Sequence, residues 1–278
     1  MVVSGHWHSF TNALLNNRNG KPILVTQAFS SGTAYGDIDL EIDRASRDVV
    51  AKSAAIVTTW ADTGAGLAPD AAATQLTAAA EAKVAPLVNP VIGIAANNIT
   101  RTENTAGESA LGNLIADAQR AALDTDFAFM NPGGIRADLA AGEITWGELF
   151  TVQPFGNSLV KMELTGQQIY DLLNQQWAGQ PFARILKTSG LSYVWDNALP
   201  AGNRVLTVYQ NGMPIDRAAT YSATVNSFLA DGGDNFSVLR NGANRVGGPV
   251  DLDALIDHIK AAPQPFSAAI ENRIQRIN

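Results

Sequence analysis

Alternating hydrophobic and polar positions predict two strands near the start of the chain, at 21–29 and 35–43. Gly32 lies between them as a candidate turn. Together these segments are interpreted as a hairpin that closes a sheet whose earlier strands precede the chain. Val2 and Val3 are interpreted as the end of another strand, one that is buried.

An alanine-rich run from Pro69 to Leu87 predicts a helix, because alanine has the highest helix propensity and proline is favoured in the first turn. Its weakly amphipathic surface suits a connecting helix. We therefore divide the chain into an N-terminal segment at 1–57, a linker at 58–90 and a C-terminal domain at 91–278.

After Val91 helical and strand periods follow each other closely, which indicates an α+β fold. A helix at 108–123 carries one apolar face, and Thr165 is the expected N-cap of a helix that ends near 177. A turn, a short helix and a loop are expected between 144 and 155. Strands are expected at 126–131, 158–166, 191–196, 204–215 with a turn at Asn211-Gly212, and 220–229.

Composition excludes several classes of protein. The 278 residues carry a formal charge of −7, which argues against binding to a nucleic acid polymer. Cysteine is absent, so neither disulfides nor thiolate metal sites are available. No apolar run is long enough to span a membrane, and the opening MVVSGHWHSF lacks the pattern of a signal peptide. The many Ala, Thr, Asn and Gly residues suit an exported bacterial protein, so an extracytoplasmic location is expected.

The stretch MNPGGIRADL follows a predicted buried strand with polar and glycine residues, namely Asn131, Gly133, Gly134 and Arg136. Two glycines allow a ligand to approach the backbone closely, and an arginine can pair with a carboxylate or phosphate. The alternative is a tight turn with a structural arginine.

Two other loops place an aromatic residue beside glycine. Phe155 stands between Pro154 and Gly156, and in FLADGGDNF Phe228 is followed by a glycine pair and Asp234. An aromatic residue beside Pro and Gly can also be a core plug. Taken together, two rings, two glycine pairs and polar side chains predict a pocket for a nucleoside or mononucleotide.

At these positions the chain resembles the 5'-nucleotidase family of metallophosphatases, which includes cyclic-nucleotide phosphodiesterases with 3'-nucleotidase activity. The resemblance rests on GESALGNLIADAQ, NPGGIRADL, VQPFGNSLVKMELTGQQI and NSFLADGGDNF for the C-terminal domain, and on SGHWH with the strands after it for the end of the metallophosphoesterase domain. It implies a layered α/β/β/α domain, preceded by a remnant of the metallophosphoesterase sheet and a connecting helix.

The resemblance also implies roles for individual residues. Phe155 and Phe228 would sandwich the base, Asn131 would hydrogen-bond it and Asp234 would bind ribose hydroxyls. The remaining positions it marks as substrate pocket or backbone contacts are Gly133, Gly134, Arg136, Gly190 and Arg101.

His6 and His8 resemble the family's last metal motif, in which histidines contribute to a dinuclear site for Zn, Mn or a similar cation. The other ligand motifs of the family are not found in the sequence, and two histidines cannot hold a metal pair. We therefore expect this chain to bind substrate without hydrolysing it.

Three hypotheses follow from the sequence. The chain is a nucleotide-binding domain of a 5'-nucleotidase-type phosphoesterase, an enzyme completed by a separate chain, or a non-catalytic binding module. A 2',3'-cyclic-nucleotide phosphodiesterase and a UDP-sugar hydrolase are alternative activities within the family. Open strands near the N-terminus also favour self-association.

Overall fold

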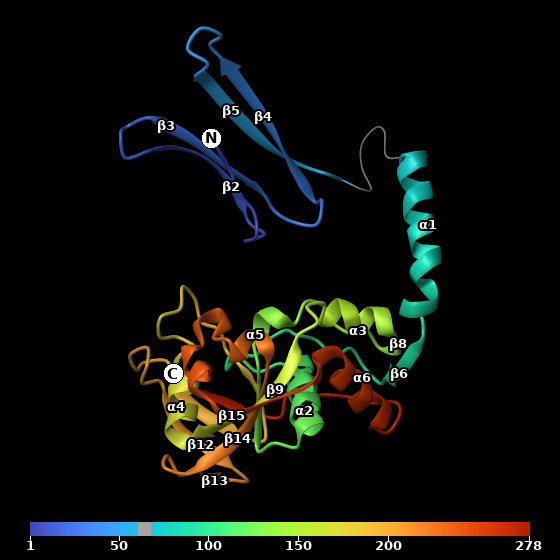
Figure 1. Cartoon of the computed structure of the whole chain (residues 1–278), viewed down its shortest axis with the longest axis vertical. Helices are drawn as coiled ribbons and strands as arrows, with labels where there is room; N and C mark the ends of the chain where they lie inside the picture. The colour runs from blue at the N-terminus through green and yellow to red at the C-terminus, as the bar shows by residue number, and fades with distance from the viewer. Residues whose placement is uncertain (61–67) are drawn as a thin grey trace. The chain divides into compact units, whose positions relative to one another are not determined.

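The computed structural model describes residues 1–60 and 68–278, which form two compact units, Met1–Ala78 and Ala79–Asn278 (Figure 1). The division between them falls inside helix α1, Ala71–Val88, none of whose residues is buried. Positions 61–67 of the expected linker lie outside the described residues. In the described part of the chain, no helix combines the length and apolarity needed to cross a membrane.

The described residues of the N-terminal unit form two small sheets. One has the order β1-β3-β2, with β1 at Val2–Val3, β2 at Phe10–Asn16 and β3 at Pro22–Ala28. The other pairs β4, Ala34–Ile42, with β5, Val49–Thr58.

The two expected N-terminal strands are confirmed as β3 and β4, but the hairpin between them is wrong. β3 pairs with β2 through a turn that contains Gly20 at φ 75°, and β4 pairs with β5. The turn before β5 is closed by Asp43, whose Oδ2 accepts from the backbone N and Oγ of Ser46. Each strand therefore pairs with its other neighbour in the sequence, β3 with the strand before it and β4 with the strand after it.

The C-terminal unit is built on a five-stranded sheet of order β10-β7-β14-β9-β15. Its strands are β7 Phe127–Met130, β9 Ser158–Thr165, β10 Lys187–Ser189, β14 Thr220–Asn226 and β15 Ala243–Val250. A second sheet has the order β13-β12-β11-β16, with β11 Ser192–Asp196, β12 Val205–Gln210, β13 Met213–Pro214 and β16 Ile274–Ile277. A short pair joins β6 Val91–Ala95 to β8 Gly142–Thr145.

The helices of this unit are α2 Ala110–Leu123, α3 Trp146–Val152, α4 Gly166–Asn174, α5 Ser227–Ala230 and α6 Asp251–Ala261, with 3-10 turns η1 Pro132–Gly134, η2 Gly233–Asn235 and η3 Ser237–Asn241. The α+β class is confirmed. Two expected boundaries are wrong: Ile144 and Thr145 belong to β8 rather than to a turn, and the predicted strand at 220–229 ends at Asn226, where α5 begins.

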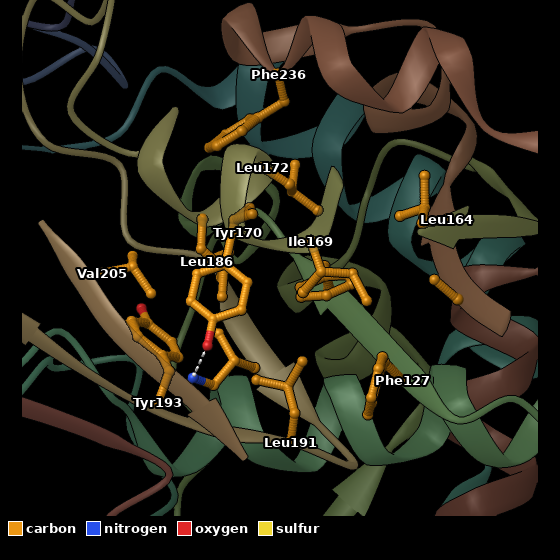
Figure 2. Packing of buried hydrophobic residues seen from close by; sticks show 14 of the residues in the cluster. Phe127, Leu164, Ile169, Tyr170, Leu172, Leu186, Leu191, Tyr193, Val205 and Phe236 are labelled. Carbon is orange, nitrogen blue, oxygen red and sulfur yellow. Dashed lines mark hydrogen bonds between the residues drawn. The ribbon is translucent and has the colours of Figure 1, made fainter. Parts of the chain in front are cut away.

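Two hydrophobic cores lie in the C-terminal unit. The first contains residues of α4 and both larger sheets, with Phe127, Ile169, Tyr193 and Val205 among them (Figure 2). The second gathers residues of α2, α3 and α6. Successive residues of a strand point to opposite faces, so Phe129 joins the first core while Met130 joins the second. The five-stranded sheet is thus covered on both faces.

Local signals account for the helices that hold this sheet. The expected apolar face of α2 is confirmed, because Leu111, Leu114, Ile115 and Ala118 are all buried. Thr165 caps α4 as expected: its side chain accepts from the Gln168 backbone N and the Gln168 side chain accepts from the Thr165 backbone N.

Candidate functional site

Several loops of the five-stranded sheet meet at one of its ends. β7 and β14 are parallel neighbours and finish at Met130 and Asn226. β9 and β10 run the opposite way, so they begin at this same end, where Leu159 is paired with Asn226 and Lys187 with Met130. The sheet topology therefore brings together segments 131–136, 153–157, 179–186 and 226–236, here called the β7-end loops.

A hydrogen-bonded group centred on Asp234 joins three of these loops. Asn131 Nδ2 donates to Asp234 Oδ2 at 2.9 Å, and Asn226 Nδ2 donates to Asn131 Oδ1 at 3.0 Å. Arg184 Nε lies 3.4 Å from Asp234 Oδ1, and Gln180 Nε2 donates to the Asp234 backbone O at 2.7 Å. The carboxylate is held from both sides by side chains far away in the sequence.

The glycine pair before Asp234 has two separate structural reasons. Gly232 adopts φ +80°, a left-handed conformation that favours glycine. Gly233 is restricted by space instead, because an added Cβ would lie 2.5 Å from Cε1 of the Phe228 ring. Asp234 itself has φ 53°. The Phe228 ring thus packs directly against the backbone at Gly233, next to Asp234.

The two candidate aromatic residues are both exposed. Phe155 is 57% exposed and Phe228 is 45% exposed, so neither is a core plug. Ser227 Oγ donates to Asn157 Oδ1 at 3.4 Å, which joins the two loops next to these rings. Two large apolar rings therefore stand in solvent on adjoining loops, where a planar ligand can reach them.

Of the two candidate arginines, Arg136 lies within segment 131–138 and Arg101 contacts it. Arg136 is exposed, with Cζ 5.9 Å from the centroid of Phe155 and Nη1 donating to Gly133 O at 3.4 Å. Arg101 Nη1 donates to Ile135 O at 3.3 Å, and its Nε is 4.0 Å from Asp138 Oδ1. Both guanidinium groups are therefore attached to the loop that begins with Asn131.

The two glycines of η1 differ in their surroundings. A Cβ at Gly134 would lie 2.4 Å from Met130 Cε and 3.1 Å from Asn131 Oδ1, so a side chain there would crowd the asparagine. A Cβ at Gly133 would meet nothing closer than 3.7 Å. Packing within the protein explains glycine at 134 and leaves glycine at 133 without a steric reason.

Gly190 is not brought together with the other candidates. It follows β10, at the end of the sheet where β7 begins, and a Cβ on it would lie 1.9 Å from Asp126 O. Its φ is +79°. Gly190 also lines a cavity of about 250 Å³ beside Asp117, Arg120 and Arg273. The close approach of Asp126 O explains why glycine occupies position 190.

His6 and His8 belong to the N-terminal unit, where both are exposed and both have positive φ, 73° and 54°. Across residues 1–60 and 68–278, no group of three or more His, Cys, Asp or Glu side chains is placed to hold a metal ion. Two imidazoles alone do not provide the ligands of a metal pair. The described residues therefore do not fit a complete metal centre.

Sequence reasoning missed the residues on segment 179–186. Arg184 and Gln180 contact Asp234, and the Arg184 guanidinium lies 4.4 Å from the centroid of Phe182, a ring that is 53% exposed. Pro181-Phe182 repeats the pattern of Pro154-Phe155, so the same signal could have found it.

A buried carboxylate beside the Phe155 loop was also missed. The Asp251 backbone N donates to Asn157 O at 2.8 Å, and Asn157 Nδ2 donates to Asp251 Oδ2 at 3.4 Å. Burial raises the pKa of Asp251 to about 6, and the hydrogen bond from Asn157 opposes this. Asp251 begins α6, so it anchors the Phe155 loop to that helix.

Comparison with known proteins matches residues 83–241 to the family described as 5'-nucleotidase, C-terminal domain. An endonuclease of Bacillus subtilis is 37% identical over 277 residues, covering 99% of this chain and 22% of its own length. A cell wall protein of Listeria monocytogenes is 34% identical and covers 98% of this chain and 37% of its own length.

Among solved structures, a 5'-nucleotidase precursor from Thermus thermophilus is 31% identical, with a TM-score of 0.75 over 100% of this chain and 57% of its own. The chain thus spans well under half the length of both curated relatives and little more than half of the Thermus chain.

Proposed function

Because this chain belongs to the family of 5'-nucleotidase C-terminal domains, we propose that it binds a nucleoside or nucleotide at the β7-end loops. The observation that carries the proposal is the placement of two exposed rings, Phe155 and Phe228, on loops that adjoin the Asn131–Asp234 hydrogen bond. Rings supply stacking for a base, and the polar pair supplies acceptors and donors for its edge and its sugar.

Each candidate residue at or against the β7-end loops has a role in this proposal. Phe155 and Phe228 stack on the two faces of the base, Asn131 hydrogen-bonds it and Asp234 accepts from ribose hydroxyls. Arg136 and Arg101 attract the phosphate of a nucleotide, and the Gly133–Gly134 turn lets the ligand approach the backbone. The steric freedom at Gly133 supports this last point, since nothing in the protein itself requires glycine there.

For the whole protein we propose hydrolysis of nucleotide phosphate esters. The residues described here do not fit a complete metal centre, so the proposal assigns them binding alone, with His6 and His8 contributing to a Zn or Mn pair completed elsewhere. When bound, such a pair supplies an activated water and neutralises charge on the phosphate. Cyclic nucleotides and UDP-sugars are alternative substrates that the same stacking rings would accept.

The proposal extends to location and association. An extracytoplasmic protein is supported by the cell wall protein among the relatives. Self-association is supported by exposed apolar side chains on β2, where Phe10, Leu14 and Leu15 are 55%, 60% and 55% exposed.

Calorimetric titration with adenosine and AMP tests the binding proposal. We expect Phe155→Ala/Phe228→Ala to weaken both ligands by about 30-fold or more, since each stacked ring contributes about 1–3 kcal/mol. Phe10→Ala/Phe29→Ala is the matched control, because those rings are 55% and 46% exposed in the other unit. Equal affinities for the unchanged protein and the Phe155/Phe228 variant would contradict the proposal.

Phosphate release from AMP, measured in parallel with Mn²⁺ and with Zn²⁺, tests the second part. We expect binding without release. Metal-dependent release that the Phe155→Ala/Phe228→Ala variant diminishes would show that the chain is itself an active phosphatase.

A further inference from the structure

The segment between α4 and β10 is fastened to the loop that carries Asp234. Gln180 Nε2 donates to the Asp234 backbone O at 2.7 Å, and Gln175 Nε2 donates to Ser237 Oγ at 2.8 Å. The Val238 backbone N donates to Gln175 Oε1 at 3.2 Å. These contacts join residues about sixty positions apart, so the segment between α4 and β10 holds the Asp234 loop in place.

Within residues 1–60 and 68–278, the Asp234 side chain has one protein partner on each oxygen. Oδ2 accepts from Asn131 at 2.9 Å, and Oδ1 lies 3.4 Å from Arg184 Nε. A carboxylate oxygen has two lone-pair positions, so each oxygen retains capacity for one more donor. The side chain is 19% exposed, which leaves it within reach of a ligand. Two neighbouring acceptors of this kind match two neighbouring hydroxyl groups.

Arg184 is itself held in one orientation. Its side chain is only 16% exposed, its Cζ lies 4.4 Å from the centroid of the Phe182 ring, and its Nη1 donates to Gln180 Oε1. Contact with the Phe182 ring and the hydrogen bond to Gln180 together limit the movement of the guanidinium. Nε is consequently kept 3.4 Å from Asp234 Oδ1, an ion pair that a lysine amine could not make while also holding the contacts to Phe182 and Gln180.

We propose that Arg184 is a positioning residue that orients Asp234 to accept from both hydroxyls of a ribose cis-diol, and so makes the site selective for ribonucleosides. The proposal rests on the proposed function, since it takes the β7-end loops as the nucleoside site. Asn131 fixes one oxygen and Arg184 fixes the other. Without Arg184, the carboxylate can turn about its side-chain bonds and no longer presents both oxygens together.

The test compares adenosine with 2',3'-dideoxyadenosine, which has the same base but lacks both hydroxyls, by calorimetric titration of the full chain. For the unchanged protein we expect adenosine to bind at least about tenfold more tightly. Arg184→Gln removes most of this ratio by weakening adenosine about tenfold, while dideoxyadenosine changes by less than about twofold.

Arg204→Gln is the matched control. Arg204 is also an arginine over an aromatic ring, with Cζ 5.4 Å from the centroid of Trp177, and its Nε donates to Leu199 O at 3.1 Å. Since these contacts do not include Asp234, we expect the ratio of the two affinities to stay unchanged in this variant. Thermal unfolding monitored by circular dichroism verifies that each variant is folded.

Two further variants separate positioning from folding. Asp234→Asn is expected to remove the selectivity, and adding Arg184→Gln to it to change the ratio no further, because the two residues act through one group. Arg184→Lys keeps the charge and most of the volume, so it replaces Arg184→Gln if that variant unfolds, and it is expected to lower the ratio as well.

The outcomes distinguish this proposal from the proposed function. Equal weakening of both ligands by Arg184→Gln would show a structural role and overturn the positioning role alone, as would an unchanged ratio. If the unchanged protein binds neither adenosine nor AMP, the nucleoside site itself is wrong and the selectivity with it.

Discussion

The substitution Gly233→Ala tests whether Phe228 is a stacking surface by moving the ring without removing it. The new Cβ would lie 2.5 Å, 2.6 Å and 2.6 Å from Cε1, Cδ1 and Cζ of Phe228, which is closer than carbon atoms approach in folded proteins. The ring must therefore move. Because Phe228 is 45% exposed, it can turn towards solvent and leave the rest of the loop in place.

The effect on stability is expected to be small. Gly233 does not have positive φ, so alanine fits its backbone, and reduced freedom of the unfolded chain stabilises the protein by about 0.4–1 kcal/mol. A displaced rotamer at Phe228 costs about 0.5–1.5 kcal/mol. These contributions nearly cancel, so the midpoint of thermal unfolding is expected to shift by less than about 4 °C.

The effect on binding is expected to be larger. Displacing one ring from the base removes stacking of about 1–3 kcal/mol, which weakens adenosine by about 5- to 150-fold. Calorimetric titration measures the affinity and circular dichroism the unfolding midpoint. Gly247→Ala is the control, because nothing lies within 4 Å of its added Cβ. A folded Gly233→Ala protein with unchanged affinity would refute the stacking role of Phe228, and an equal loss in both variants would refute its specificity.

Two further predictions concern stability. Gly190→Ala is expected to lower the free energy of unfolding by about 2–4 kcal/mol, because φ is +79° and the added Cβ would lie 1.9 Å from Asp126 O. Chemical denaturation measures this cost, and a loss below about 1 kcal/mol would contradict the prediction. The pKa of Asp251 is raised from 3.8 to about 6, so this carboxyl group binds a proton more tightly in the folded state than in the unfolded state. Protonation of Asp251 therefore contributes its full stabilisation below pH 3.8, and this contribution is lost as the pH rises through about 6. Asp251→Asn should therefore raise stability by about 1 kcal/mol at pH 8 and bring no gain at pH 4; a gain of equal size at both values, measured by urea denaturation, would contradict this assignment.

Much of the secondary structure could be predicted from the sequence because it depends on local pattern. The apolar face of α2 and the Thr165 cap of α4 follow from residues within one or two turns of helix. The hairpin of β12 and β13 follows from Asn211-Gly212, which adopts φ 51° and 77° as such a turn requires. The wrong N-terminal hairpin has the same origin: strand character is local, whereas the choice of partner depends on turns at both ends.

The candidate site shows the same division. The residue pattern identified loops that contain Phe155, Phe228 and Asp234, but the family resemblance also selected Gly190, which lies at the opposite end of the sheet. Arg184 gave no signal, because its importance comes from contact with a residue fifty positions later in the chain.

The sequence by itself determined which residues favour helices, strands and tight turns, and which loops offer rings and polar groups. Only the tertiary structure decided which of those loops meet. The physical reason is that burial and backbone preference leave their pattern within a few neighbouring residues, whereas the direction and order of β10, β7, β14 and β9 set which strand ends share one side of the sheet. The parallel pairing of β7 with β14 brings Asn131 to Asp234, where Asn131 Nδ2 donates to Asp234 Oδ2 at 2.9 Å. This hydrogen bond joins residues 103 positions apart, so no local sequence pattern predicts it.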